Sequence, residues 1–434
     1  MQTTPVEFTV HATDLGVIDV LVVGGGIAGC FAAATAARQG ASVLLVEGMG
    51  CLGGTLTHGL VPQVLDRTDK GGMIQELYNF LDSNGLSCPR AGKCTDENGK
   101  LLPGNITSVE GAKVFFDRLC MDAGVRIMLY SHVIDVNVTE RNITQVLIGS
   151  ECGAYTVKAK IFIDATGNGT LSRMAGCQGE IGHPTTGMPQ PASMTAEITG
   201  ITRETSVYGA DEKDAYGRML ADHGIAISGT QSGVVRMPDL QNWLFSVNFE
   251  YGVNPADIFS LTQATIHGRG ECLDSTLKHR TIPGYENVSI TAGTERLGIR
   301  EGLRIQGNYR LTVDDILNGA RFDDAICMVY FNVDIHKLHN EDTTSTSRGF
   351  RSKPYHIPFR CLVPSEIDNM LLCGRLISGD FFAHASYRVM GPMGATGEAA
   401  GFAAAFCVSH AISPQKFDGK LARDYMKSQG YGGI

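Results

Sequence analysis

The hydrophobic pattern near the N-terminus predicts a strand, a helix and a second strand. Residues 18–23 (IDVLVV) and 42–47 (SVLLVE) are almost continuously apolar, which is typical of parallel strands buried on both faces. Between them, residues 28–39 are mostly small, which suits a helix packed closely on a sheet. Together these segments predict a βαβ unit.

Further strands and helices are predicted along the chain. Two amphipathic helices and four strand segments follow the βαβ unit: helices over 70–84 and 109–123, a strand region over 125–138, short antiparallel strands over 142–148 and 154–157, and a buried strand over 160–164. The stretch DNMLLCGRL, from residue 368, predicts a return to the first sheet. The stretch GPMGATG at 391–397 then precedes a long helix of small residues.

The pattern changes between residues 181 and 310. The alternation in NWLFSVNFE (242–250) predicts a half-exposed antiparallel sheet, and residues 258–277 predict a helix across it. We therefore expect an α/β fold. One discontinuous domain (1–180 and 341–434) contains a parallel central sheet, and an inserted α+β domain (181–340) contains an antiparallel sheet.

Composition and charge narrow the class of protein. The 434 residues are 43% hydrophobic, as expected for a soluble globular chain of two domains. The formal net charge of −9 disfavours nucleic acid and anionic membranes as partners. There is no apolar run of about 18 residues and no signal-peptide pattern, so we expect a cytoplasmic protein.

The cysteine and histidine spacings do not predict a metal site. The 12 cysteines are scattered without any CxxC pair, which excludes zinc-ribbon and ferredoxin-type motifs. Cys88 and Cys94 share a polar loop and are an alternative metal or redox pair. His336 and His339 lack a matching third ligand. We therefore expect buried thiols in a reducing compartment and no bound metal.

The first turn has the pattern of a dinucleotide-binding site. Gly24, Gly26 and Gly29 form GxGxxG between the first strand and helix, where glycines permit a tight turn, close approach of a pyrophosphate and close helix packing. The N–H groups and positive dipole end of the helix would face the phosphates. Glu47 ends the next strand, where an acidic residue accepts hydrogen bonds from ribose hydroxyls.

Three further features favour FAD over NAD. Gly53 and Gly54 follow the acidic residue, and two strand ends, DATGNG at 164–169 and LLCGR at 371–375, carry small-residue turns. Such turns meet around the ligand at the carboxyl edge of an open α/β sheet. No second GxGxxG unit is present, so no internal NAD(P)H domain is expected.

These features resemble the FAD-dependent oxidoreductases of the glutathione-reductase-like superfamily. Three blocks, RIQGNYRLTVDDI (304–316), YHIPFRCLVPSEIDNMLLCGRLIS (355–378) and SYRVMGPMGATGEAAGFAAA (386–405), are similar to those of the bacterial FAD-dependent oxidoreductase family. That family is related to the flavin domains of fumarate reductases and heterodisulfide reductases. The resemblance covers most of the chain, weakest across 85–105 and 200–240, and implies a Rossmann-like FAD-binding domain in a flavoprotein.

The resemblance also implies the residues that contact the cofactor. They are Gly24, Gly26, Ile27, Ala28, Gly29, Glu47, Gly48, Gly53, Gly54, Thr55, Val133, Ala165, Thr166, Gly167, Gly374, Arg375, Gly394, Ala395 and Thr396. Relatives usually carry Asp where this chain has Asn168, which retains a hydrogen-bonding oxygen without the charge. N–H groups at 391–397 are expected to face the flavin N1–C2=O edge, the alternative being a tightly packed helix start.

Polar residues beside the C-terminal motif are the candidates for substrate chemistry. Arg388 would clamp a carboxylate or act as an acid, and His384 would remove a hydroxyl proton. Tyr387, His356 and Arg360 are further candidates. The alternative is that Arg388 pairs with a buried acid and that His384 is a core histidine.

Two other groups of residues leave alternatives open. Helical spacing would put Arg296, Arg300 and Arg304 on one face near Glu301, either as a domain-interface ion-pair network or as an anion site. Cys51 and His58 flank the second glycine pair and are candidates for covalent attachment of FAD, a question that the sequence leaves open.

The predicted function is therefore that of an FAD-dependent oxidoreductase. It would exchange a hydride between flavin N5 and a small polar metabolite, by dehydrogenating CH–OH or CH–CH or by reducing an activated double bond. The alternative is an electron-transfer subunit without an organic substrate, and a third possibility is a protein in which FAD only organises a site. The expected partners are a small molecule and an unidentified electron donor or acceptor, with homo-oligomerisation left open.

Overall fold

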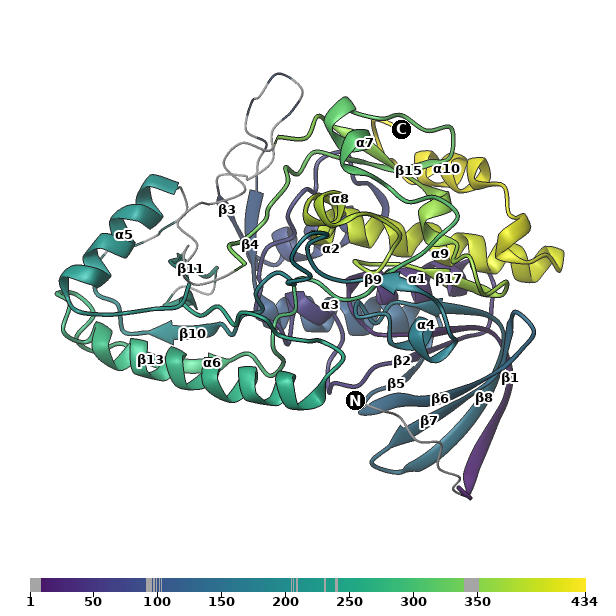
Figure 1. Cartoon of the computed structure of the whole chain (residues 1–434), viewed down its shortest axis with the longest axis horizontal. Helices are drawn as coiled ribbons and strands as arrows, with labels where there is room; N and C mark the ends of the chain where they lie inside the picture. The colour runs from purple at the N-terminus through teal and green to yellow at the C-terminus, as the bar shows by residue number, and fades with distance from the viewer. Residues whose placement is uncertain are drawn as a thin grey trace.

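The computed structural model describes residues 9–90, 96, 98, 100, 102, 104–203, 205, 207, 210–229, 232–238, 241–338 and 351–434 (Figure 1). Its main body is a seven-stranded sheet covered by helices, and a second, smaller sheet lies beside it under a long helix. No helix among the described residues is both long and apolar enough to span a bilayer.

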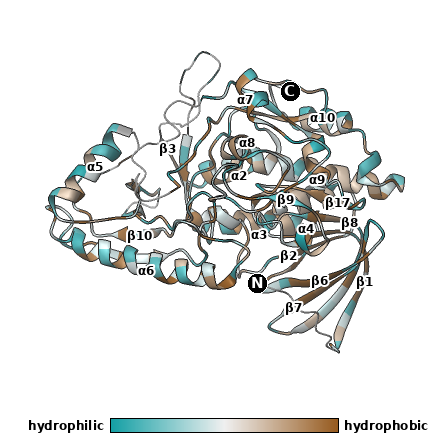
Figure 2. Cartoon of the chain, in the orientation of Figure 1, coloured by the Kyte–Doolittle hydropathy of each residue, from teal (hydrophilic) through white to brown (hydrophobic). Residues whose placement is uncertain are grey.

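The central sheet confirms the predicted parallel core. Its parallel strands are β5 (Arg126–Met128), β2 (Val43–Val46), β1 (Ala12–Val23), β8 (Gly153–Asp164) and β17 (Met370–Leu372). The fully buried pattern of β2, and of the last four residues of β1, explains why both are continuously apolar (Figure 2). The strand that starts at residue 370 returns to this sheet, as predicted.

Strand β8 corrects one sequence-based boundary. Residues 154–157 and 160–164 were predicted as separate strands, whereas they form one continuous strand. Its first half pairs antiparallel with β7 (Asn142–Ser150), which pairs with β6 (Ser131–Thr139), and its last residues pair parallel with β17. The two halves have different neighbours, so their hydrophobic patterns differ although the backbone is continuous.

Small residues allow two helices to pack in close contact behind the sheet. Helix α1 (Ile27–Arg38) lies against α9 (Met390–His410), and a Cβ added at Gly397 or Gly401 would lie 2.0 or 2.3 Å from a carbonyl oxygen of α1. Helix α9 begins at Met390, so the prediction that 391–397 precedes the helix is wrong: these residues form its first two turns. Glycine is a poor helix former, so the glycines in this stretch led to the prediction that it lies outside the helix.

The remaining elements of this part of the chain are mostly short. They are α2 (Gly72–Ser83), β3 (Ser87–Arg90), β4 (Gly104–Thr107), α3 (Val109–Asp122), α4 (Thr170–Met174), β9 (Gly179–Glu180), β14 (Arg304–Ile305), α7 (Val313–Asn318), β15 (Ala325–Val329), β16 (Tyr355–Pro358), α8 (Phe381–Tyr387) and α10 (Gly419–Ser428), with short 3₁₀ turns at Gly54–Leu56, Phe359–Leu362 and Pro414–Lys416. The predicted helices at 70–84 and 109–123 correspond to α2 and α3.

The second sheet is antiparallel, as its alternating pattern predicts. Its order is β11 (Gly233–Arg236), β12 (Asn242–Ser246), β10 (Ala196–Thr199) and β13 (Ser289–Gly293). Helix α6 (Ile258–His279) matches the predicted helix and packs on this sheet, and α5 (Ala210–Asp222) lies nearby (Figure 1).

The prediction that this sheet is half-exposed is wrong at β12. Phe245 faces a separate hydrophobic core that draws on residues 192–297, while Leu244 on the opposite face packs with Leu60 and Val109 from the first part of the chain. Both faces are therefore covered. From Ile305 onward the buried residues belong to the large core again, and the domain limits at 181 and 340 remain a prediction.

Candidate flavin and substrate site

A cleft of about 1250 Å³, counting the space that opens to solvent, lies at the carboxyl ends of the parallel strands. Its lining comes from segments 23–28, 46–48, 54–59, 131–133, 165–170, 296–299, 374–375 and 388–393. Three of these segments directly follow β1, β8 and β17, so parallel pairing alone brings together turns that are far apart in the sequence.

Bare backbone forms the wall of the cleft around the first turn. Gly24 has a φ of +103°, and a Cβ at this position would lie 2.6 Å from the Ala165 carbonyl oxygen. A Cβ at Gly29 would lie 1.8 Å from the Gly24 oxygen, so any side chain at this position would prevent the close contact between helix and turn. Gly26 bridges to Gly53, and the Gly53 N–H donates to the Gly25 carbonyl over 2.8 Å. These glycines leave a groove that a pyrophosphate can approach closely.

Glu47 and Asp164 hold the turns after β1 and β8 in place through hydrogen bonds. The buried Glu47 carboxylate accepts hydrogen bonds from the Gly25 N–H over 2.6 Å and from the Met49 N–H over 2.8 Å. Each of its oxygens can still accept a second bond, such as one from a ribose hydroxyl. Asp164 accepts bonds from the backbone and hydroxyl groups of Thr166 and Ser172, which fixes the DATGNG turn.

Most of the sequence-predicted cofactor residues line this cleft. They are Gly24, Gly26, Ile27, Ala28, Glu47, Gly48, Gly54, Thr55, Val133, Ala165, Thr166, Gly167, Gly374 and Arg375. Asn168 also lines it, and its Oδ1 accepts a 2.7 Å hydrogen bond from the Arg375 guanidinium.

Five residues of the predicted set do not line the cleft. Gly29 and Gly53 pack against backbone and side chains behind it, while Gly394 and Ala395 are buried in α9. The Thr396 hydroxyl accepts a 2.9 Å bond from the Gly374 N–H, so its side chain positions the turn after β17. The start of α9 at Met390 explains the shift, because its first turn, where Met390 and Met393 line the cleft, comes a few residues earlier.

Arg388 is the one predicted substrate-chemistry residue on the cleft. Its guanidinium donates to the Asp334 carbonyl over 2.9 Å and to the Gln190 side chain over 3.2 Å, and lies 3.5 Å from the Asp334 carboxylate. Its Nε is buried without a partner. Burial lowers the pKa of Arg388 from its ordinary value.

The other predicted substrate-chemistry residues lie away from the cleft. His384 and Tyr387 are fully buried, and the Tyr387 hydroxyl donates to the Ile377 carbonyl over 2.9 Å. His356 uses both ring nitrogens on backbone groups of Phe322 and Gly433. Helix α8 begins at the Asp380 N-cap and is buried along almost its whole length, so His384 and Tyr387 both lie in the core.

Two further cations lie close to Arg388. Arg375 is partly buried, and burial together with the charges of Arg296 and Arg388 lowers its pKa to about 9. Arg296 is exposed in the cleft wall and forms no ion pair among the described residues. Residues 294–303 are not helical, so the prediction of a helical arginine face is wrong. Arg304 instead pairs with Glu301, away from the cleft, through a short contact.

His58 has no hydrogen-bond partner for one ring nitrogen. It is 8% exposed, it lines the cleft, and its Nδ1 is buried without a partner. Burial, and then the charge of Arg296, lowers the pKa of His58 to about 4. The imidazole is therefore neutral near pH 7 and can donate or accept one hydrogen bond from a bound molecule.

Sequence reasoning did not place Ser131 and His132 on the cleft. No motif marks them, since they come from β6, whose contact with the crevice depends on the sheet order. In the sequence, Arg296 was noted only as one of a regularly spaced series of arginines.

The fold and the glycine-lined crevice define a class of Rossmann-type FAD-binding flavoproteins. The residues present fit FAD: glycine backbone leaves space along the pyrophosphate groove, and the Glu47 carboxylate can still accept hydrogen bonds from ribose hydroxyls. The FAD dependent oxidoreductase family matches residues 19–426, and the chain belongs to this family. It is an FAD-dependent oxidoreductase.

Solved structures similar to this chain share the fold at low identity. A geranylgeranyl bacteriochlorophyll reductase-like protein from Thermoplasma acidophilum is 14% identical with a TM-score of 0.50, covering 96% of this chain and 84% of that one. A flavin-dependent brominase is 15% identical with a TM-score of 0.51 over 96% and 84%. A flavoprotein/dehydrogenase from Cytophaga hutchinsonii is 12% identical with a TM-score of 0.50 over 94% and 82%. No curated protein matches the chain.

Proposed function

We propose that this FAD-dependent oxidoreductase exchanges a hydride with a small metabolite that carries a carboxylate. The observation that supports this most directly is the group of three guanidiniums, of Arg296, Arg375 and Arg388, on the cleft that also holds the dinucleotide crevice. Bound FAD would supply the hydride acceptor or donor at flavin N5.

The arginines favour an anion because their charges are poorly compensated. Burial, and then the charges of Arg296 and Arg388, lower the pKa of Arg375, as expected where each of these cations repels the Arg375 charge. The ion-pair contact of Arg388 among the described residues is with the Asp334 carboxylate, at 3.5 Å, which also contacts His336 at 3.3 Å. A carboxylate bound among these groups would offset the cost of bringing the cations together.

Arg388 would orient the substrate carboxylate, and His58 would handle the proton. Arg388 is held by the Asp334 carbonyl and by Gln190, so its guanidinium is fixed before the substrate arrives. His58 is neutral, so its ring can accept a proton from a hydroxyl group or return one. These roles replace the proposed base His384, which does not line the cleft.

The test begins with the visible spectrum of the purified protein. Acid precipitation then separates dissociable FAD, which leaves a yellow supernatant, from FAD attached through Cys51 or His58, which leaves a yellow pellet. Anaerobic mixing with 2-hydroxy acids, saturated dicarboxylates and their neutral ester or alcohol analogues follows. Enzyme reduced with dithionite is mixed in parallel with enoates.

We expect carboxylated compounds alone to bleach the oxidised flavin or to reoxidise the reduced flavin. Equal rates with neutral analogues would contradict the anionic substrate. Reduction only by a protein donor would instead support the electron-transfer subunit.

A further inference from the structure

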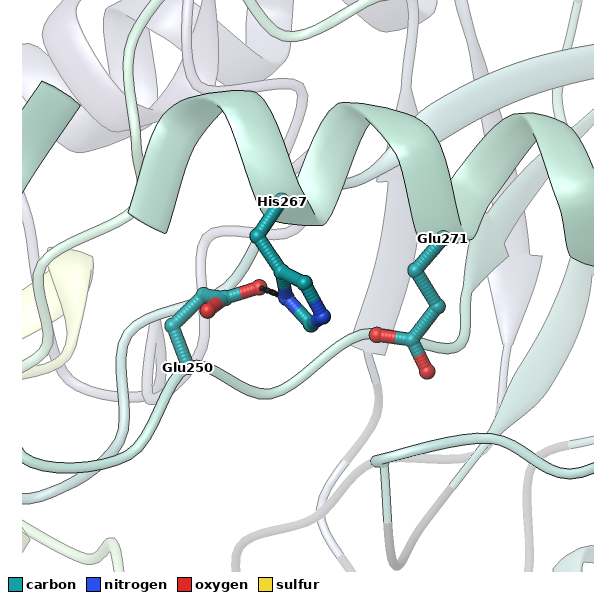
Figure 3. Close-up of side chains that lie close together, drawn as sticks. All are labelled: Glu250, His267 and Glu271. Carbon is teal, nitrogen blue, oxygen red and sulfur yellow. Dashed lines mark hydrogen bonds and ion pairs between the residues drawn. The ribbon is translucent and has the colours of Figure 1, made fainter. Parts of the chain in front are cut away.

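Three side chains with metal-binding atoms meet at a second place, under α6 (Figure 3). His267 and Glu271 lie one turn apart on α6, so they project from the same face, and Glu250 approaches from the segment after β12. One possible ligand atom from each lies within 4.8 Å of the others. None of the three lines the flavin cleft.

A fully buried asparagine gathers the two carboxylates. The Asn248 amide donates to a Glu250 oxygen over 2.6 Å and to a Glu271 oxygen over 2.7 Å, and its own oxygen accepts from the Met194 N–H over 2.8 Å. Ser228 holds Glu271 further, through its N–H and its hydroxyl, each over 2.5 Å. The carboxylates are therefore fixed by outer contacts, as ligands of metal sites commonly are.

The negative charge of this cluster has little compensation. Among the described residues, no lysine or arginine forms an ion pair with Glu250 or Glu271. The one ion-pair contact is the 2.8 Å approach of His267 Nδ1 to Glu250. Two carboxylates whose other hydrogen-bond partners, Asn248 and Ser228, are neutral create a place for a cation.

The cluster is open to solvent on one side. The His267 side chain is 68% exposed, and a surface hollow is lined by His267, Glu271, Ser228 and Asp274. Water can therefore reach the cluster and fill remaining coordination positions. Ligand atoms around one ion must approach to about 3.5 Å, and the exposed imidazole is free to move that distance.

We propose that Glu250, His267 and Glu271 bind one divalent transition-metal ion, Zn²⁺ or Mn²⁺. An imidazole nitrogen with two carboxylate oxygens suits these ions, whereas Mg²⁺ and Ca²⁺ prefer oxygen alone. The ion takes the place of the proton between His267 and Glu250. This revises the expectation, drawn from spacing in the sequence, that the protein holds no metal.

The ion would brace the second sheet against the substrate end of the cleft. It connects α6 to the chain at Glu250, and the preceding residue, Phe249, packs its ring against Arg300 at 4.7 Å and His336 at 5.0 Å. His336 in turn contacts Asp334, the partner of Arg388. The expected role of the metal is structural.

Calorimetric titration of the chelator-treated, FAD-loaded protein with Mn²⁺ tests the proposal. We expect one equivalent to bind, and His267→Ala to weaken binding by about tenfold or more. Mg²⁺ serves as the all-oxygen comparison and should bind at least tenfold more weakly than Mn²⁺. His223→Ala changes an exposed histidine on another segment and should leave Mn²⁺ affinity unchanged.

Co²⁺ provides a second readout that distinguishes this site from thiols. Bound Co²⁺ should show visible bands of nitrogen and oxygen coordination without a thiolate charge-transfer band, and Cys152→Ser, which removes an exposed thiol, should not alter them. His267→Ala should unfold at the wild-type temperature in metal-free buffer, because the side chain is mostly exposed.

The absence of Mn²⁺ binding, or equal affinity in wild type and His267→Ala, would overturn the proposal. Neither measurement depends on flavin reduction, so a failure of the metal proposal can be distinguished from a failure of the proposed function.

Discussion

The two ends of the flavin cleft are built in different ways. The nucleotide end consists of backbone and small residues within short loops, such as Gly24–Gly29 and the turn after Asp164. The end that we propose for the substrate consists of charged side chains, Arg296, Arg375 and Arg388, from three separate segments.

The difference follows from what each end would bind under the proposed function. A pyrophosphate is recognised by N–H groups and a helix dipole, so bare backbone suffices and tolerates little change. A particular metabolite is recognised by a few side chains, which differ among enzymes that share one fold. Substitutions at the nucleotide end should therefore remove FAD, and those at the other end should change chemistry while FAD stays bound.

The largest effect is expected for Gly29→Val. Its Cβ would lie 1.8 Å from the Gly24 oxygen, so α1 must move away from the turn. Such overpacking costs about 3 kcal/mol, or roughly a hundredfold in FAD affinity. The flavin absorbance retained after gel filtration measures the loss. Gly217→Ala in α5, where a Cβ meets nothing within 4 Å, is the control and should retain FAD fully.

Arg388→Gln is expected to spare FAD and to impair the reaction. Loss of a charged hydrogen bond to the substrate costs about 1.5–3 kcal/mol, or about 10- to 100-fold in the rate of anaerobic flavin reduction at low substrate. Arg360→Gln is the matched control, because that arginine pairs with Asp324 outside the cleft. An equal loss of the flavin-reduction rate in Arg388→Gln and Arg360→Gln would contradict a specific role for the arginine on the cleft.

His58→Asn tests the buried imidazole through the pH dependence of stability. The pKa of His58 is lowered to about 4 in the folded protein, so the unfolded chain binds more protons between pH 4 and its ordinary value of 6.5. The wild-type free energy of unfolding therefore falls on acidification through this range. Between pH 6.5 and 4.5, the free energy of unfolding of the variant should fall by about 2 kcal/mol less than that of the wild type. Urea unfolding at each pH measures these free energies. An equal fall in both proteins over this pH range would argue against a buried neutral imidazole.

The smallest effect is expected for Arg296→Gln. This arginine is exposed, so salt and water screen its charge, and its removal should weaken carboxylate binding by about two- to fivefold. Titration of the flavin spectrum with the substrate carboxylate measures the change. The difference from wild type should shrink at high ionic strength, and a loss as large as that of Arg388→Gln would place Arg296 in direct contact with the substrate.

The sequence alone determined the nucleotide end. The strand at 18–23, the GxGxxG turn and Glu47 are contiguous, and local periodicity together with glycine chemistry defines them without knowledge of the rest of the fold. The same holds for the predicted helices at 70–84, 109–123 and 258–277, where the hydrophobic pattern extends over several turns.

Only the tertiary structure decided which polar side chains face the cleft. Arg388 and His384 are four residues apart, yet one lines the cleft and the other is buried among core residues. The same applies to Glu250, which joins His267 and Glu271 only because the segment after β12 lies against α6. Contacts between distant segments depend on strand order and helix packing, and the spacing of residues along one chain carries no record of these distances.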